Sequence, residues 1–195
     1  MTLKSICVFC GASPGSLPVF REAALAVGAE LARRGVRLVY GGGDVGLMGA
    51  VADGALAGGG TVIGVIPEAL AAQEIAHPGV SDLRVVRSMH ERKALMAELS
   101  DGFVALPGGY GTFEEFCEVV TWTQLGVHSK SCGLLNVAGF YDPLLALIDG
   151  AVEKRFIRAE HRALVLSDTD FPALLAKMAT FVAPTTPKWI DRDAT

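Results

Sequence analysis

The chain has 195 residues, of which 51% are hydrophobic, and a formal net charge of −4. These values allow one domain with a sizeable core, and they exclude the disordered and collagen-like classes. Because no long run of Lys or Arg occurs, we expect no nucleic-acid partner. No apolar stretch approaches the roughly 20 residues that span a bilayer, and no separate signal region precedes the first strand-like run. We therefore expect a cytoplasmic protein without a membrane partner.

Short β-branched runs alternate with longer helical stretches along the whole chain. Strands are predicted at 4–10, 36–40, 61–66, 83–86, 102–106, 132–136 and 163–166. Helices are predicted near 18–34, 46–58, 89–100, 113–127, 142–153 and 170–181. This alternation is typical of an α/β fold with a doubly wound, mostly parallel sheet in a Rossmann-like three-layer arrangement. We expect one domain over residues 1–182 and a C-terminal surface tail over 183–195.

The four cysteines are too few and too apolar in setting for a disulfide scaffold, and the four histidines show no metal-ligand spacing. We expect neither a metal nor a cofactor. Cys7 and Cys10 form a C-x-x-C motif, which elsewhere indicates redox chemistry or half of a metal site. Here the motif lies in an apolar strand-like run, where residues three apart face opposite sides. Core packing is the favoured interpretation.

Glycine-rich loops follow the first two predicted strands, at residues 10–16 and 41–49. In a doubly wound sheet the ligand binds beyond the carboxyl ends of the strands, and glycines let the backbone approach it closely. Each loop is also explained as a tight turn without a ligand. The second lacks the G-x-G-x-x-G order of a dinucleotide-binding fingerprint.

The strongest signal is the segment 107–115, PGGYGTFEE, between a predicted strand and a predicted helix. Its glycines expose backbone N–H groups, and the helix N-terminus favours a phosphate there. The lysine of a Walker A loop is missing, so a monophosphate fits better than a triphosphate. Thr112-x-x-Glu115 also reads as a capping box, a role that does not exclude a catalytic one. As a first-turn carboxylate, Glu115 is expected to be kept ionised by the helix N-terminus.

A second helix is predicted to begin after Ser88, in the segment 88–96, SMHERKALM. Ser88-x-x-Glu91 is a capping box, which makes Glu91 most simply a cap. Arg92 follows at the end of the first turn, where a cation is unfavourable. It is therefore placed for a ligand or an opposing carboxylate, and the alternative is a solvated surface arginine.

Taken together, the segments GGGDVGLMG, SMHERKALM and PGGYGTFEE, followed by TWTQLG, resemble the Lonely Guy family of cytokinin riboside 5′-monophosphate phosphoribohydrolases. The likeness runs from Cys7 to about residue 182, with the motifs in the family's order. Many members have carried the label of lysine decarboxylase. No lysine in this sequence stands in a setting typical of pyridoxal phosphate enzymes.

The resemblance implies that Arg92 and Glu115 are the catalytic pair. It also implies a substrate-binding set that contains Ser13, Gly43, Glu74, Met89, Lys93, Gly108, Gly109, Gly111 and Thr112. Within this set Gly109, Gly111 and Thr112 would hold the phosphate with help from Ser13. Met89 and Lys93 would border the nucleoside. The family likeness further implies a homodimer, for which the predicted helices 89–100 and 113–127 are the candidate interface elements.

The implied reaction is hydrolysis of the N-glycosidic bond of an adenosine 5′-monophosphate, with or without an N6 modification, to a free base and ribose 5-phosphate. Positive charge develops on the sugar and negative charge on the leaving base, as in glycoside hydrolysis. Glu115 would stabilise the sugar cation and orient or deprotonate water, and Arg92 would offset charge on the base. Two alternatives stay open, a general AMP nucleosidase for salvage and a non-catalytic nucleotide or molybdenum cofactor carrier. A carrier would not need both Arg92 and Glu115.

Overall fold

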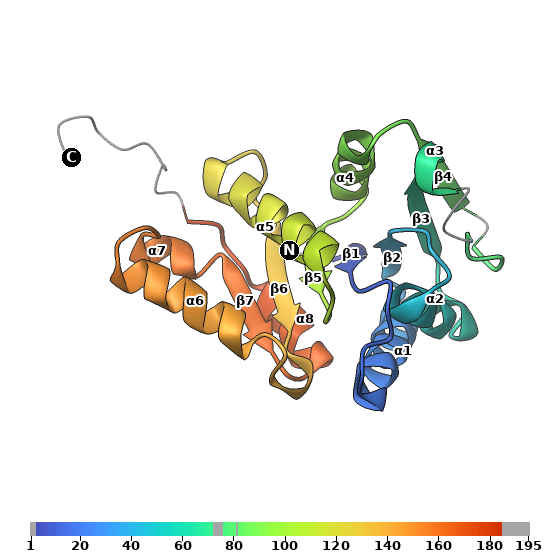
Figure 1. Ribbon diagram of the computed structural model, residues 1–195, viewed down its shortest axis with the longest axis horizontal. Coiled ribbons are helices and arrows are strands. Elements are labelled where there is room, and N and C mark those ends of the chain that lie inside the picture. Colours follow the sequence, from blue (N-terminus) through green and yellow to red (C-terminus); the bar gives the residue numbers. More distant parts are fainter. Residues whose placement is uncertain (1–2, 72–75, 81, 185–195) are drawn as a thin grey trace.

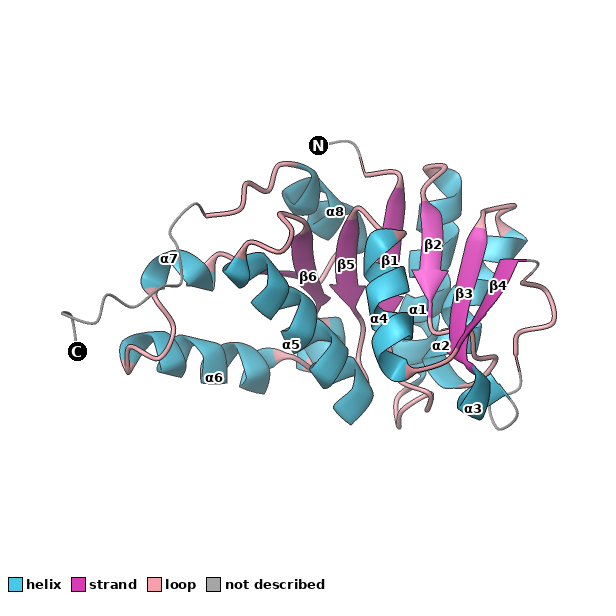
Figure 2. Ribbon diagram, turned by 90° about the horizontal axis from the view of Figure 1, so that it is seen from above, coloured by secondary structure: helices cyan, strands magenta, loops and turns pink. Residues whose placement is uncertain are grey.

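A seven-stranded parallel sheet lies between two layers of helices in the computed structural model, which describes residues 3–71, 76–80 and 82–184 (Figures 1 and 2). Its strands are β1 (Ser5–Phe9), β2 (Arg37–Tyr40), β3 (Val62–Pro67), β4 (Asp82–Val86), β5 (Gly102–Ala105), β6 (Ser131–Leu135) and β7 (Val165–Asp168). They are arranged in the order β4-β3-β2-β1-β5-β6-β7, and neighbouring strands all pair in parallel. The predicted fold class is confirmed.

Helices cover both faces of the sheet. They are α1 (Pro18–Arg33), α2 (Gly46–Ala57), α3 (Glu68–Ala71), α4 (Met89–Glu98), α5 (Tyr110–Leu125), the 3-10 helix η1 (Val137–Gly139), α6 (Asp142–Glu153), α7 (Ala159–Arg162) and α8 (Phe171–Ala179). One core cluster joins the sheet to α1, α2 and α8, and the other joins it to α4, α5 and α6. Among the described residues, no helix has the length and apolar character needed to cross a bilayer.

The seven predicted strands and the six predicted helices are all present, with ends shifted by up to three residues. The short segments α3, η1 and α7 were not predicted, because pieces of three or four residues carry no periodic apolar signal. The predicted start of α5 at residue 113 is wrong. The helix begins at Tyr110 because Gly109 adopts an extended N-cap conformation and Gly111 is accommodated in the first turn.

The chain reverses its direction of winding at the centre of the sheet. From β1 it winds outward through β2 and β3 to β4, and then returns to β5 on the other side of β1. The carboxyl ends of β1 and β5 therefore form a topological switch point, where open α/β sheets bind their ligands. The glycine-rich segments 10–16 and 107–111 leave the sheet there.

Two glycines allow α1 and α2 to pack with their backbones in close approach. A Cβ added at Gly28 would lie 2.1 Å from the Val51 carbonyl oxygen, and one at Gly54 would lie 2.1 Å from the Leu25 carbonyl oxygen. We expect Gly54→Ala to lower the free energy of unfolding by about 1–3 kcal/mol, as overpacking does. Chemical denaturation measures this change.

Gly150→Ala is the matched control for Gly54→Ala. Gly150 lies in α6, and an added Cβ would meet only the end of the Lys154 side chain, at 3.7 Å. There alanine should stabilise the protein by about 0.5–1 kcal/mol, because glycine is unfavourable inside a helix. Equal effects of the two substitutions would contradict the close approach of α1 and α2.

Candidate active site

Two loops meet at the switch point and are joined through their backbones. The Gly11 N–H donates to the Pro107 carbonyl at 3.1 Å, and the Leu47 N–H at the start of α2 donates to the Gly11 carbonyl at 3.0 Å. These bonds satisfy main-chain groups that the sheet no longer pairs. They also place the loop after β1 beside the glycine loop (residues 107–111).

A cavity of about 250 Å³ opens beside these loops. Its lining residues are Val8, Phe9, Cys10, Gly11, Ala12, Gly41, Met48, Arg92, Met96, Gly109, Gly111, Thr112 and Glu115. A neighbouring cavity of about 370 Å³ shares Gly11, Ala12 and Gly109 with it and is also lined by Ser13 and Gly108. The structure thus brings seven of the eleven predicted site residues to two adjoining cavities.

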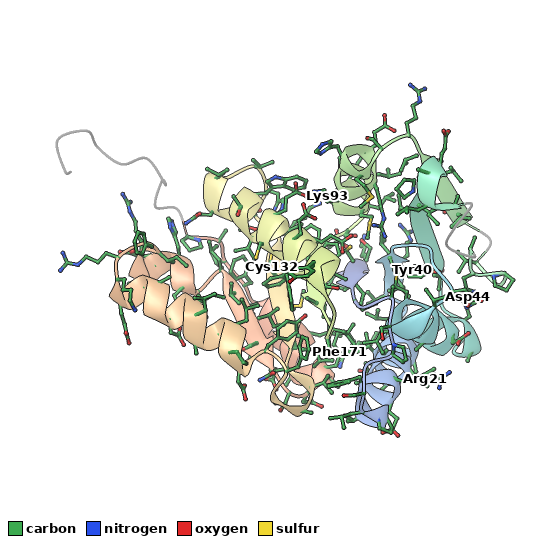
Figure 3. The ribbon with its side chains drawn as sticks, in the orientation of Figure 1. Arg21, Tyr40, Asp44, Lys93, Cys132 and Phe171 are labelled. Carbon is green, nitrogen blue, oxygen red and sulfur yellow. The ribbon has the colours of Figure 1, made fainter. Side chains whose placement is uncertain are left out.

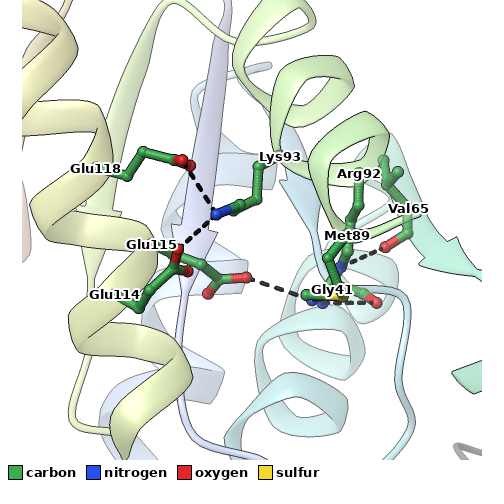
Figure 4. Close-up of polar contacts among 8 residues, drawn as sticks. All are labelled: Gly41, Val65, Met89, Arg92, Lys93, Glu114, Glu115 and Glu118. Atoms are coloured by element: carbon green, nitrogen blue, oxygen red, sulfur yellow. Dashed lines mark hydrogen bonds and ion pairs between the residues drawn. The ribbon is translucent and has the colours of Figure 1, made fainter.

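Arg92 is buried in the cavity wall and is held by oxygen atoms from three segments of the chain. Its Nε donates to the Val65 carbonyl at 3.0 Å, its Nη2 to the Gly41 carbonyl at 3.2 Å, and its Nη1 to Glu115 Oε1 at 3.3 Å (Figure 4). Because a guanidinium has five N–H groups, these three bonds and a weaker contact of Nη1 with the Met89 sulfur at 4.0 Å leave one Nη2 N–H for a ligand. The alternative of a solvated surface arginine is wrong.

Gly41 makes room for this arrangement. A Cβ at Gly41 would lie 2.2 Å from Arg92 Nη2, so a side chain there would displace the guanidinium. Gly41 directly follows β2, and Val65 lies in β3. The sheet therefore fixes the direction in which Arg92 points from α4.

Glu115 does not cap α5, so the capping-box interpretation of this residue is wrong. Since α5 begins at Tyr110, Thr112 is the third helical residue and Glu115 the sixth, beyond the first turn. The Glu115 carboxylate instead accepts the hydrogen bond from Arg92 and lines the cavity, with 8% of the residue exposed. The two side chains come from α4 and α5 and meet across the cavity.

The expectation that the helix N-terminus keeps Glu115 ionised is also wrong. Burial raises the pKa of Glu115 to about 7, even though the charge of Arg92 acts in the opposite direction. Desolvation of the carboxylate therefore outweighs the attraction of a guanidinium 3.3 Å away. A carboxyl group that titrates near neutral pH inside a cavity is suited to proton transfer.

Lys93 and Met89 line neither cavity. Lys93 Nζ lies between α4 and α5, where it contacts Glu114 at 2.5 Å and Glu118 at 3.1 Å (Figures 3 and 4). Met89 is 41% exposed, and its sulfur lies 4.0 Å from Arg92 Nη1. Contacts of these two side chains with a nucleoside stay a prediction.

The glycine loop leaves open space at the start of α5. A Cβ added at Gly109 or Gly111 would meet no atom within 4 Å, so packing does not require glycine at either position. A Cβ at Gly108, by contrast, would lie 2.1 Å from Thr112 Oγ1. The start of α5 thus presents backbone to the cavity, in the arrangement that binds anions.

Three other predicted ligand-binding residues lie apart from the cavity centre or cannot be placed. Ser13 is exposed, and its hydroxyl accepts a hydrogen bond from the Gly15 N–H at 3.3 Å. Gly43 is buried, forms a backbone bridge with Ala76 and lines neither of the two cavities. Glu74 lies outside the described residues, as do residues 185–195 of the predicted tail.

Sequence reasoning missed several lining residues, including Cys10, Met48 and Met96. Met96 is four residues after Arg92 in α4, so helical periodicity offered a signal. Cys7 packs in the core as expected, whereas Cys10 lies beyond the end of β1 and lines the cavity. Both thiols are free, and burial raises their pKa values, which disfavours the reactive thiolate form.

Of the two hydrogen bonds expected in the capping box of α4, only the one accepted by Ser88 is present. Ser88 Oγ accepts from the Glu91 N–H at 3.1 Å, as predicted. The Glu91 carboxylate accepts from the Arg87 N–H at 2.8 Å rather than from Ser88, so the box is not reciprocal. This cap fixes the first turn that carries Arg92.

Fold and cavity define a Rossmann-like α/β protein with a candidate ligand-binding site at its topological switch point. A family model described as "Possible lysine decarboxylase" matches residues 48–178. The probable cytokinin riboside 5′-monophosphate phosphoribohydrolase LOGL1 of Oryza sativa subsp. japonica is 54% identical over 90% of this chain and 79% of its own length. The cytokinin riboside 5′-monophosphate phosphoribohydrolase LOG1 of Arabidopsis thaliana is 49% identical over 92% of this chain and 84% of its own length. The chain therefore belongs to the Lonely Guy family of cytokinin riboside 5′-monophosphate phosphoribohydrolases.

More distant solved structures share the fold. The molybdenum cofactor carrier protein of Chlamydomonas reinhardtii superposes with a TM-score of 0.66 at 23% identity, over 88% of this chain and 94% of that one. The molybdenum cofactor binding protein of Rippkaea orientalis superposes with a TM-score of 0.67 at 21% identity, over 92% of this chain and 96% of that one. At these identities the likeness shows the fold alone.

Proposed function

We propose that this protein hydrolyses the N-glycosidic bond of adenosine 5′-monophosphate-type nucleotides and releases the free base and ribose 5-phosphate. The observation that carries the proposal is the buried pair of Arg92 and Glu115 facing one cavity beside the glycine loop. The activity named for relatives about 50% identical over nine-tenths of the chain supports it. A nucleotide or molybdenum cofactor carrier would not need this pair.

In the proposed mechanism the phosphate binds at the start of α5, where Gly109, Gly111 and Thr112 line the cavity. Binding there supplies remote energy that holds the ribose beside Glu115. The ionised Glu115 stabilises positive charge on the sugar and orients or deprotonates the attacking water. Arg92 stays protonated and offsets negative charge on the departing base through its remaining Nη2 N–H and its positive charge.

The test is chromatographic detection of products after incubation with AMP, with isopentenyladenosine 5′-monophosphate and with the matching nucleosides. We expect a free base and ribose 5-phosphate from the monophosphates, and slower turnover of the nucleosides because they lack the phosphate contact. The ratio of the two rates separates activation of modified adenine from general AMP salvage. No base from either nucleotide would refute the proposal and favour a carrier.

Gly111→Ala should separate phosphate binding from folding. The added methyl group would enter open space at the start of α5, where we propose that the phosphate binds. We expect KM for AMP to rise roughly tenfold, equivalent to about 1.4 kcal/mol of binding. Thermal stability should be unchanged or higher, because alanine favours a helix. Steady-state kinetics and thermal denaturation check this, and an unchanged KM would contradict phosphate binding at Gly111.

The pH dependence should report the ionisation of Glu115. Because the proposed role needs the carboxylate, kcat/KM should rise with pH through about 7 and then level off. A phosphate monoester of the substrate also titrates near pH 6, so stability provides a second measurement. In the folded protein the pKa of Glu115 is raised from the ordinary 4.5 to about 7. The contribution of Glu115 to the free energy of unfolding is therefore fully present below pH 4.5 and is lost as the pH rises through about 7.

Comparison with Glu115→Gln isolates this contribution, because glutamine does not titrate. The difference in unfolding free energy between wild type and Glu115→Gln should fall between pH 4.5 and about 7 and stay constant above. A difference that does not vary with pH would show that Glu115 titrates normally.

We also propose that the protein is a homodimer. All residues of α6 are at least partly exposed, and Leu147 on that helix is 70% exposed. Between α5 and α6 lies an apolar cavity of about 360 Å³. These features support an interface that includes α5, one of the two helices expected from the sequence, together with α6. Light scattering that gave only the 20.4 kDa mass of one chain would refute it.

A further inference from the structure

Tyr141 is a buried aromatic residue outside every motif of the sequence, and it contacts the backbone next to the glycine loop. It is 1% exposed, and its hydroxyl donates to the Leu106 carbonyl at 2.6 Å. Leu106 is fully buried and directly precedes Pro107. Tyr141 lines neither of the two cavities at the switch point, so it does not contact a ligand bound there.

The Leu106 carbonyl lies beyond the hydrogen-bonded ladder of the sheet. The pairing of β5 with β6 ends at Ala105 and Leu134. Asn136 directly follows β6, and its N–H donates to the Asp168 carbonyl rather than to the Leu106 carbonyl. A buried carbonyl without a donor is unfavourable, and the Tyr141 hydroxyl supplies one. The tyrosine therefore fixes the peptide at the point where the chain leaves the sheet.

Tyr141 is itself held in place at the start of α6. Its N–H donates to Asn136 Oδ1 at 2.7 Å, and Asn136 Nδ2 donates to Asp142 Oδ1 at 2.6 Å. The ring of Phe140 packs edge-on against it, with centroids 5.0 Å apart. These contacts fix the position of the Tyr141 hydroxyl.

The segment after Leu106 has little freedom to absorb a shift. The Pro107 carbonyl accepts from Gly11, and Gly108 packs so closely on Thr112 that no Cβ fits between them. A rotation of the Leu106 peptide would therefore displace the backbone N–H groups at the start of α5. Because a bound anion requires several aimed N–H groups, such a displacement weakens its binding.

We infer that Tyr141 is a positioning residue for phosphate binding, which holds the glycine loop through the Leu106 carbonyl. The inference rests on the proposed function in one respect, the phosphate position at the start of α5. It adds a residue from the connection between β6 and α6, a region that supplies no residue of the proposed catalytic pair.

The experiment compares Tyr141→Phe with Tyr40→Phe. Tyr40 is also fully buried, but its hydroxyl has no hydrogen-bond partner among the described residues, so the same atom is removed without loss of a contact. Binding of ribose 5-phosphate and of adenosine is measured by calorimetry, which needs no turnover. Steady-state kinetics on AMP are measured in parallel.

For Tyr141→Phe we expect the dissociation constant of ribose 5-phosphate to rise roughly tenfold, as loss of one well-placed hydrogen bond allows. Adenosine binding should be unchanged, and the loss on AMP should appear in KM more than in kcat. Tyr40→Phe should bind both ligands as the wild type does. If Tyr141 had only a structural role, the substitution would weaken the binding of both ribose 5-phosphate and adenosine.

Unchanged binding of ribose 5-phosphate by Tyr141→Phe would overturn the inference, and so would a wild type that does not bind this ligand. If Tyr141→Phe does not fold, Asn136→Ala replaces it, because this variant removes the hydrogen bond that holds Tyr141. Asn136→Ala should also weaken the binding of ribose 5-phosphate, and unchanged binding by this variant would overturn the inference. A wild type that binds ribose 5-phosphate but releases no base from AMP would refute the proposed hydrolysis and leave the binding comparison decisive.

Discussion

Replacement of Glu115 by glutamine should reduce kcat on AMP by about 100-fold or more, the usual loss when one aimed electrostatic partner is removed. Glutamine keeps the size and hydrogen-bonding capacity of the side chain, so it can still accept from Arg92. It cannot carry the negative charge that stabilises a cationic sugar. Steady-state kinetics on AMP measure the change, with product chromatography to confirm the reaction.

Glu114→Gln is the matched control for Glu115→Gln. The neighbouring side chain loses the same charge, but it is 55% exposed and pairs with Lys93 outside both cavities. We expect little change in kcat for this variant. Equal kcat values for Glu115→Gln and the wild type would reject a catalytic role for Glu115.

Replacement of Arg92 by lysine should lower kcat/KM on AMP by about 100-fold or more. Lysine retains the positive charge, but an ammonium group cannot reproduce the planar fork that reaches Val65, Gly41 and Glu115 together. The ammonium group would therefore lack both these anchors and a fixed direction toward the ligand. Steady-state kinetics on AMP measure the effect.

Two variants define the cause of that loss. Arg84→Lys changes an exposed arginine that pairs with Asp82, and its activity should equal that of the wild type. Arg92→Met removes the charge that lowers the Glu115 pKa, so that pKa should rise above about 7 and the activity profile should move to higher pH. Full activity in Arg92→Lys would show that charge alone suffices.

The local pattern of the sequence predicted the fold well. Alternating apolar runs and helical stretches determine which residues must be buried, so all seven strands and the six longer helices were found. Helix ends were less predictable. Glycine is unfavourable in helices, yet α5 begins before Gly111, and this shift removed the capping interpretation of Glu115.

The sequence by itself determined the α/β class, the glycine loop and the residue types of the site, because these depend on composition and short-range order. Only the tertiary structure decided that Arg92 and Glu115 meet, since they lie on separate helices, 23 residues apart in the chain. It also decided that Lys93 turns toward α5 and that Tyr141 supports Leu106. Burial of Glu115, and with it a pKa near neutrality, results from packing around the cavity rather than from its neighbours in sequence.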